Sequence, residues 1–170
     1  MSLQVPPLQA DSVHVFYCRT AAQDAASAAL LPVLDDAERA AAARLRLAHA
    51  RQSYVHAHAL CRLMLSCYAP VAPSQWHFAA AAQGKPYIVN HLAQPLHFSL
   101  SHTRGLVACA VAHTAVGVDV EASERGERLH DLVATQLTER EARAAALAPD
   151  FGRFFLQRWC LKEAYLKACG

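Results

Sequence analysis

The strongest limit on the fold comes from seven apolar residues in a row, Leu106–Ala112, which predict a buried strand. Stretches rich in β-branched and aromatic residues predict further strands at 12–18, 76–80, 87–89 and 96–100. The segment 116–121 follows Leu106–Ala112 after a short turn, and two adjacent strands with a short connection predict a hairpin. The middle of the chain is therefore expected to form a small antiparallel sheet.

Helical patterns stand on both sides of these strands. An alanine-rich segment is interrupted by Pro32, and Asp35 with Asp36 can cap a helix over 37–47. Apolar positions at helical spacing predict a helix over 50–68. A helix packed on an antiparallel sheet indicates the α+β class.

The last third of the chain is predicted to be helical. A short helix is expected over 129–136, and Thr138 with Glu141 three residues later matches a capping box. A final helix is expected over roughly 151–168. Its apolar stripe is predicted to consist of residues at spacings of seven, four and three, namely Phe154, Leu161, Tyr165 and Ala168.

Composition narrows the class of protein. The chain has 170 residues, enough for one domain or two small lobes, and its 54% hydrophobic and 18% charged residues predict a globular fold. A formal net charge of +2 is too small to indicate nucleic-acid binding. The N-terminus lacks the pattern of a signal peptide, and no apolar run is long enough to span a membrane. The six cysteines form no C-x-x-C pair, which favours a reduced cytoplasmic location over a zinc site or a secreted disulfide framework.

Two carboxylates follow the apolar run in the segment Gly117–Glu121. Side chains two residues apart on a strand point to the same face, so Asp119 and Glu121 are expected to project together while Val118 and Val120 face the core. Two neighbouring carboxylates repel each other, and Mg²⁺ with its preference for oxygen ligands relieves that repulsion. The alternative is a solvated strand end before a polar loop.

The final helix carries a third acid. Glu163 and Lys167 are four residues apart and share one face, which by itself is an ordinary ion pair. The functional interpretation makes Glu163 a third acidic group near the metal and Lys167 a partner for phosphate.

Two further segments have weaker signals. Alternation in the strand at 96–100 puts Phe98 and Leu100 on one face and Ser99 and Ser101 on the other, with His102 at the strand exit. Lys85 lies on a turn made rigid by the proline that follows it. No G-x-S-x-G elbow and no glycine-rich nucleotide loop is present, which argues against a serine hydrolase and a P-loop protein.

Taken in order, these segments resemble the 4′-phosphopantetheinyl transferase superfamily. The resemblance is to its longer monomeric type, which serves non-ribosomal peptide and polyketide synthases. It extends from about residue 35 to the end of the chain. The matching motifs are Gly84-Lys85-Pro86, Phe98-Ser99-Leu100-Ser101-His102, Gly117-Val118-Asp119-Val120-Glu121 and Trp159-Cys160-Leu161-Lys162-Glu163-Ala164 with Lys167.

The resemblance implies a role for each matching residue. The Mg²⁺ ligands would be Asp119, Glu121 and Glu163, and Asp119, Glu163 and Lys167 would be the catalytic residues. Glu163 would be the general base, with a metal-bound water as the alternative. Coenzyme A would be bound through its phosphates and along its adenine by Arg51, Lys85, Pro86, Tyr87, Ser101, His102 and Lys167.

The resemblance also implies the architecture and the partners. The fold would consist of two pseudo-symmetric α/β lobes, at residues 1–112 and 113–170, each with a long helix on a small antiparallel sheet and with coenzyme A between them. Members of this type usually continue past the last motif, so the second lobe is expected to be incomplete. The acceptor would be a serine of an apo acyl or peptidyl carrier protein. Basic residues at 44, 46 and 51 are candidates for contacting this protein.

Two other functions stay open at this point. One is a catalytically weak module that binds coenzyme A or a carrier protein, because the C-terminal part of the family pattern is missing. The other is a magnesium-dependent phosphohydrolase.

Overall fold

The computed structural model describes residues 5–20, 26–123 and 136–170. Its strands are β1 (Val13–Arg19), β2 (Phe78–Ala80), β3 (Pro86–Ile88), β4 (His97–Thr103) and β5 (Leu106–Ala112). Its helices are α1 (Ala26–Leu30), α2 (Asp36–Arg44), α3 (Ala48–Leu65), α5 (Glu139–Ala146) and α6 (Phe151–Cys169), with short 3-10 turns at Leu31–Val33 and Pro73–Gln75. The long helices and the expected strands are found within a few residues of their predicted bounds, except for the strand predicted at 116–121.

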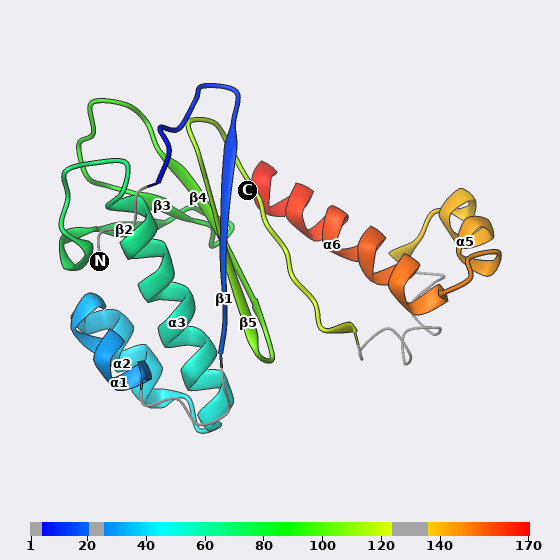
Figure 1. Ribbon diagram of the computed structural model, residues 1–170, viewed down its shortest axis with the longest axis horizontal. Helices are drawn as coiled ribbons and strands as arrows, with labels where there is room; N and C mark the ends of the chain where they lie inside the picture. The colour runs from blue at the N-terminus through cyan, green and yellow to red at the C-terminus, as the bar shows by residue number, and fades with distance from the viewer. Residues whose placement is uncertain (1–4, 21–25, 124–135) are drawn as a thin grey trace.

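The apolar run is the central strand of the main sheet. The strand order is β1-β5-β4, both pairings are antiparallel, and β2 pairs with β3 in a separate two-stranded sheet. α3 packs along one face of the main sheet (Figure 1). The buried core between them consists of Cys61, Met64, Leu65, Trp76, Leu96, Phe98, Cys109 and Val111.

The predicted hairpin between Leu106–Ala112 and 116–121 is wrong. β5 forms its hairpin with β4, and Gly105 occupies the left-handed region of that turn with φ +82°. Because β1 and β4 already pair with the two edges of β5, the segment 116–121 cannot join it. This segment instead runs in an extended conformation past β4 without becoming a strand.

A buried arginine ties α2 to α3. Asp35 caps the start of α2, as predicted, and it forms a capping box with Glu38 that was not predicted. The carboxylates of Asp35 and Glu38 also accept hydrogen bonds from Arg62 of α3. The Arg62 side chain is fully buried and also donates to the carbonyls of Pro73 and Trp76 at 3.0 Å each. Burial raises the pKa of Glu38, but hydrogen bonds from His58 and Arg62 outweigh it and lower that pKa overall.

The last third of the chain consists of the short helix α5 and the long helix α6. Thr138 and Glu141 form the predicted capping box of α5, while the short helix expected at 129–136 falls almost entirely outside the described residues. α5 packs near the N-terminal end of α6, and the C-terminal end of α6 reaches the main sheet (Figure 1). No strand follows Ala112 in the described parts of the chain, and the division into lobes at residue 112 stays a prediction.

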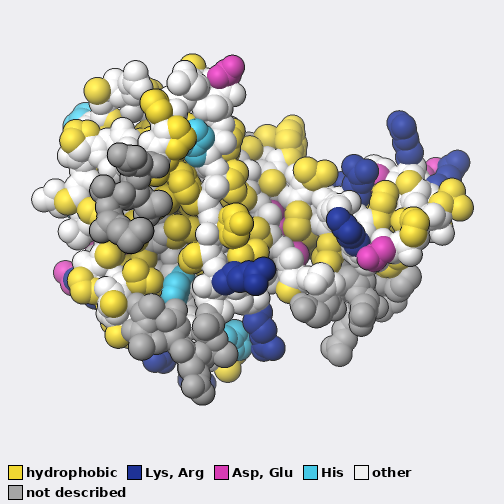
Figure 2. Space-filling model, viewed as in Figure 1, with side chains coloured by type: hydrophobic (Ala, Val, Ile, Leu, Met, Phe, Trp, Pro, Cys, Tyr) yellow, Lys and Arg dark blue, Asp and Glu magenta, His cyan; other side chains and the backbone are white. Residues whose placement is uncertain are grey.

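The predicted apolar stripe of α6 is wrong in its C-terminal half. Leu161 and Tyr165 are 62% and 69% exposed, and hydrophobic side chains are visible on the surface of α6 (Figure 2). Phe155 and Leu156 are the buried residues of this helix. The spacing of apolar residues could not show that α6 contacts the segment at Gly117 through the small residues Ala164 and Ala168.

No helix in the described ranges is both long and apolar enough to cross a membrane.

Candidate active site

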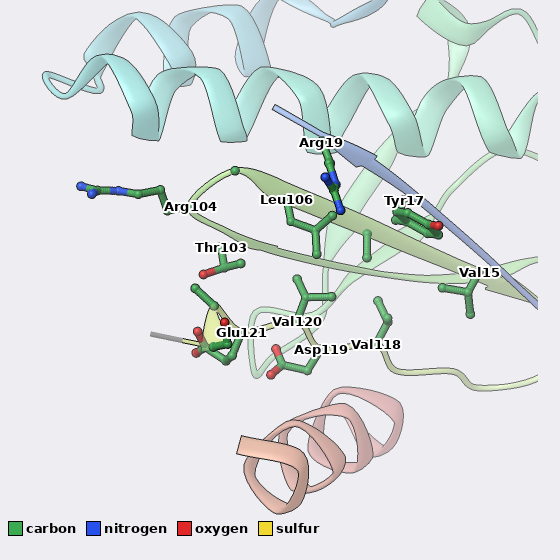
Figure 3. A pocket seen from close by; sticks show the side chains of 14 residues that line it. Val15, Tyr17, Arg19, Thr103, Arg104, Leu106, Val118, Asp119, Val120 and Glu121 are labelled. Carbon is green, nitrogen blue, oxygen red and sulfur yellow. The ribbon is translucent and has the colours of Figure 1, made fainter. Parts of the chain in front are cut away.

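The acidic segment is fastened to β4 by serine hydroxyls. The backbone N–H of Val118 donates to Ser99 Oγ at 3.1 Å, and that of Val120 donates to Ser101 Oγ at 3.2 Å. Figure 3 shows Val118 and Val120 directed toward the sheet and Asp119 on the side nearer α6. The predicted alternation of this segment is therefore confirmed, although its partner is β4 rather than β5.

Asp119 lies at the centre of a buried polar cluster. Its Oδ1 accepts hydrogen bonds from Ser101 Oγ at 2.8 Å and from Lys167 Nζ at 2.7 Å. Lys167 Nζ also donates to Ser101 Oγ at 3.2 Å and to the carbonyl of Val118 at 3.3 Å. The Asp119 side chain is only 8% exposed. Motifs 48 and 66 residues from Lys167 thus meet in one place.

Close contact between backbones brings α6 to this cluster. A Cβ on Gly117 would lie 1.8 Å from the Ala164 carbonyl oxygen and 2.7 Å from the Ala168 nitrogen. Only glycine fits at this position without displacing the helix. The same approach puts Cys160 beside Asp119, where burial first and then the neighbouring carboxylate raise the pKa of the thiol to about 12.

The second carboxylate oxygen of Asp119, Oδ2, is a candidate ligand for a metal ion. This oxygen is buried and has no hydrogen-bond partner in the described parts of the chain. An unpaired buried carboxylate oxygen is costly, and a divalent cation would satisfy it. Glu121 is close enough for its charge to raise the pKa of Cys160, so a second carboxylate is near.

The third predicted metal ligand, Glu163, makes no described contact with Asp119. Glu163 is half-buried on α6, three residues after Cys160 and four before Lys167, both of which lie at Asp119. Across residues 5–20, 26–123 and 136–170, no three His, Cys, Asp or Glu side chains converge as a ready-made metal site. Lys167 is the partner of Asp119 Oδ1 instead. The ligand set of Asp119, Glu121 and Glu163 therefore stays a prediction.

Some of the predicted coenzyme A contacts lie near the cluster. His102 follows Ser101 on β4 and therefore points to the opposite face of the strand, the face covered by α3. Its pKa is lowered first by burial and then by the neighbouring His58 and Lys167. Lys85 Nζ donates to the carbonyl of Ala168 at 2.8 Å, near the C-terminal end of α6 where a cation is favoured. Pro86 and Tyr87 line an open pocket with Lys85 and the last residues of α6.

Arg51 lies in a different environment. Its guanidinium donates to the Leu45 carbonyl, with Nη2 at 2.9 Å, and it lines a separate pocket with Leu31 and Val55. Arg51 thus contacts the end of α2, and its role in binding coenzyme A stays a prediction.

Sequence reasoning missed two features of the site. The sequence placed Ser99 on the same face as Ser101 but did not predict that its hydroxyl binds the Val118 amide. The shared face could have indicated this contact. The ion pair between Lys162 and Glu141, at 2.6 Å, was also missed. The Lys162 hydrogen bond, which joins α6 to α5, is the main reason that the pKa of Glu141 falls to about 2.

Comparisons of the sequence with known proteins identify a family. Residues 115–170 match the family model described as "ACPS: 4'-phosphopantetheinyl transferase superfamily". The 4′-phosphopantetheinyl transferase HetI of Nostoc sp. is 31% identical over 175 residues, covering 99% of this chain and 74% of the relative. A 4′-phosphopantetheinyl transferase of Bacillus subtilis is 28% identical over 102 residues, covering 58% of this chain and 43% of the relative.

A solved structure was also found. The holo-(acyl-carrier-protein) synthase from Bacillus anthracis in complex with CoA (3′,5′-ADP) aligns with a TM-score of 0.42 and 14% identity, covering 58% of this chain and 91% of that chain.

The structure defines an α+β fold in which buried Asp119 and Ser101 meet the half-buried Lys167. The near full-length similarity to the Nostoc enzyme is specific enough to assign a family. The chain belongs to the 4′-phosphopantetheinyl transferase superfamily. The predicted family, α+β fold and enzyme class are confirmed.

Proposed function

We propose that this chain transfers the 4′-phosphopantetheine arm of coenzyme A to a serine of an apo acyl or peptidyl carrier protein, with Mg²⁺ bound at Asp119. The observation that supports it most directly is the hydrogen-bonded cluster of Asp119, Ser101 and Lys167. It combines an unpaired carboxylate oxygen, suited to a divalent cation, with an ammonium group suited to phosphate. Both groups are needed at a reacting pyrophosphate.

In the proposed reaction the carrier serine oxygen forms a bond to the β-phosphorus of coenzyme A. The bond from that phosphorus to the bridging oxygen breaks, and 3′,5′-ADP leaves with the electron pair. Glu163 would accept the proton of the serine hydroxyl. Asp119, Glu121 and Glu163 would hold Mg²⁺, which when bound neutralises charge on the pyrophosphate oxygens.

The lysines supply the remaining positive charge. Lys167 neutralises Asp119 in this structure, and its side chain is one-third exposed, so it can also reach a phosphate at the surface of the cluster. Lys85 on the β2–β3 turn would contact the same anion, and His102 would have to reach it from the opposite face of the end of β4. Most of the rate enhancement would come from holding the phosphate and stabilising its charge.

The proposal is tested by incubating the protein with coenzyme A, Mg²⁺ and an apo carrier protein and measuring the carrier mass. A gain of one phosphopantetheine group is expected, together with one equivalent of 3′,5′-ADP. Omission of Mg²⁺ with chelator should abolish the gain. Release of nucleotide from coenzyme A with an unmodified carrier would contradict transfer and indicate a phosphohydrolase.

A binding module is the second candidate function. It is favoured by one observation, namely that no three His, Cys, Asp or Glu side chains converge as a metal site in the described residues. Calorimetric binding of coenzyme A or carrier without any mass gain would support this function. The monomeric state and the cytoplasmic location stay predictions from the sequence.

A further inference from the structure

The acidic segment 117–121 is held in a way that ordinary strands are not. Neighbouring strands lie about 4.8 Å apart and pair through hydrogen bonds between backbone N–H and C=O groups. Here the amides of Val118 and Val120 donate to the side-chain hydroxyls of Ser99 and Ser101 on β4. Both pairs are two residues apart, so two hydroxyls on one face of β4 receive two amides on one face of the segment.

The two serines have different tasks. The Ser101 hydroxyl donates to Asp119 Oδ1 and accepts from Val120 N–H and Lys167 Nζ, which uses its one hydrogen and both lone pairs. Ser99 makes no described contact with an acid or with Lys167. It is 6% exposed, and its hydroxyl accepts from the amide of Val118, the residue immediately before Asp119.

We propose that Ser99 is a positioning residue, whose buried hydroxyl holds the Val118 amide and thereby fixes Asp119 for the cation and for Lys167. This inference rests on the proposed function. Without the hydroxyl, the Val118 amide loses its acceptor, and an unsatisfied amide favours a displaced segment. The backbone that carries Asp119 would then be fastened at Val120 alone on this side.

The first test uses NMR to measure the hydrogen-exchange rate of the Val118 amide in wild type, Ser99→Ala and Ser99→Thr. Exchange should be about tenfold faster in Ser99→Ala, the change that a loss of one hydrogen bond produces in the opening equilibrium. Ser99→Thr keeps the hydroxyl and should restore protection. Ser66→Ala is the matched control, because the Ser66 hydroxyl accepts from the Trp76 indole N–H at 2.9 Å, away from Asp119.

The second test is Mn²⁺ binding with coenzyme A present, measured by electron paramagnetic resonance. The dissociation constant should rise about three- to tenfold in Ser99→Ala and stay within about twofold of wild type in Ser99→Thr and Ser66→Ala. In the transfer assay, Ser99→Ala should need a correspondingly higher Mg²⁺ concentration for half-maximal rate, while the rate at saturating Mg²⁺ changes less.

Three results would overturn the proposal: unchanged Val118 exchange in Ser99→Ala, equal Mn²⁺ affinity of Ser99→Ala and wild type, or no Mn²⁺ binding by wild type. The failure of the proposed function looks different. A wild-type protein that binds Mn²⁺ but modifies no carrier, with Ser99→Ala still showing faster exchange and weaker binding, would contradict transfer and support the positioning role.

Discussion

Replacing Arg62 by methionine is expected to destabilise the protein by about 3–5 kcal/mol, the usual cost of removing one partner of a buried ion pair. The guanidinium donates to Glu38 Oε2 at 2.8 Å, to Asp35 Oδ2 at 2.5 Å and to two backbone carbonyls. Methionine fills most of the volume, so the loss measures the four unsatisfied acceptors rather than a cavity. Against a typical total of about 5–15 kcal/mol, this is a large fraction.

Urea unfolding followed by circular dichroism measures the effect. With a slope of about 2 kcal/mol per molar, the midpoint should fall by about 2 M. Arg143→Met is the matched control, because Arg143 is 80% exposed and its ion pair with Glu139 is worth less than about 0.5 kcal/mol. A loss below about 1 kcal/mol for Arg62→Met would refute the reasoning.

The same variant has a signature in acid. The folded-state pKa of Glu38 lies below its ordinary 4.5, so the ionised carboxylate stabilises the folded protein above that pH and the contribution is lost as the pH falls through the folded pKa. Arg62→Met removes one of the groups that lower this pKa and leaves the burial that raises it. The stability of the variant should therefore fall less steeply below pH 4.5 than that of wild type.

The remaining predictions concern α6 and its contacts. Gly117→Ala should separate α6 from the acidic segment, because the added Cβ would overlap the Ala164 carbonyl. The contact between Lys167 and Asp119 should then be lost and the transfer rate should fall. An unchanged transfer rate would contradict this packing. Lys162→Met should raise the pKa of Glu141 from about 2 toward its ordinary 4.5, measured by NMR titration. Since a lowered carboxyl pKa stabilises the fold above pH 4.5 and ceases to do so near pH 2, wild type should lose stability in that window and the variant should lose less.

Local patterns in the sequence predicted much of the fold. The apolar run became the central strand, the capping residues Asp35 and Thr138 start helices, and the alternation around Ser99 holds in the structure. Each of these signals depends on residues within a few positions of one another. The choice of hairpin partner does not, because it depends on which strands compete for the two edges of β5.

Long-range electrostatics were less predictable. A fully buried arginine resembles a surface arginine in the sequence, so Arg62 gave no signal before its acceptors were known. The sequence predicted Asp119 near a metal and Lys167 near a phosphate, but it did not predict a direct contact between the two side chains. The structure shows a direct ion pair, because α6 approaches Gly117 closely enough for the lysine to reach Asp119.

The most direct measurement of the central claim is the single-turnover rate of carrier modification at saturating coenzyme A, carrier and Mg²⁺. It is compared among wild type, Asp119→Asn, Glu163→Gln and the exposed control Glu139→Gln. A fall of about 10²–10³-fold is expected in the first two variants while both remain folded by circular dichroism, with a normal rate in the control. A rate within about threefold of wild type in folded Asp119→Asn would contradict a reaction centred on the Asp119 cluster.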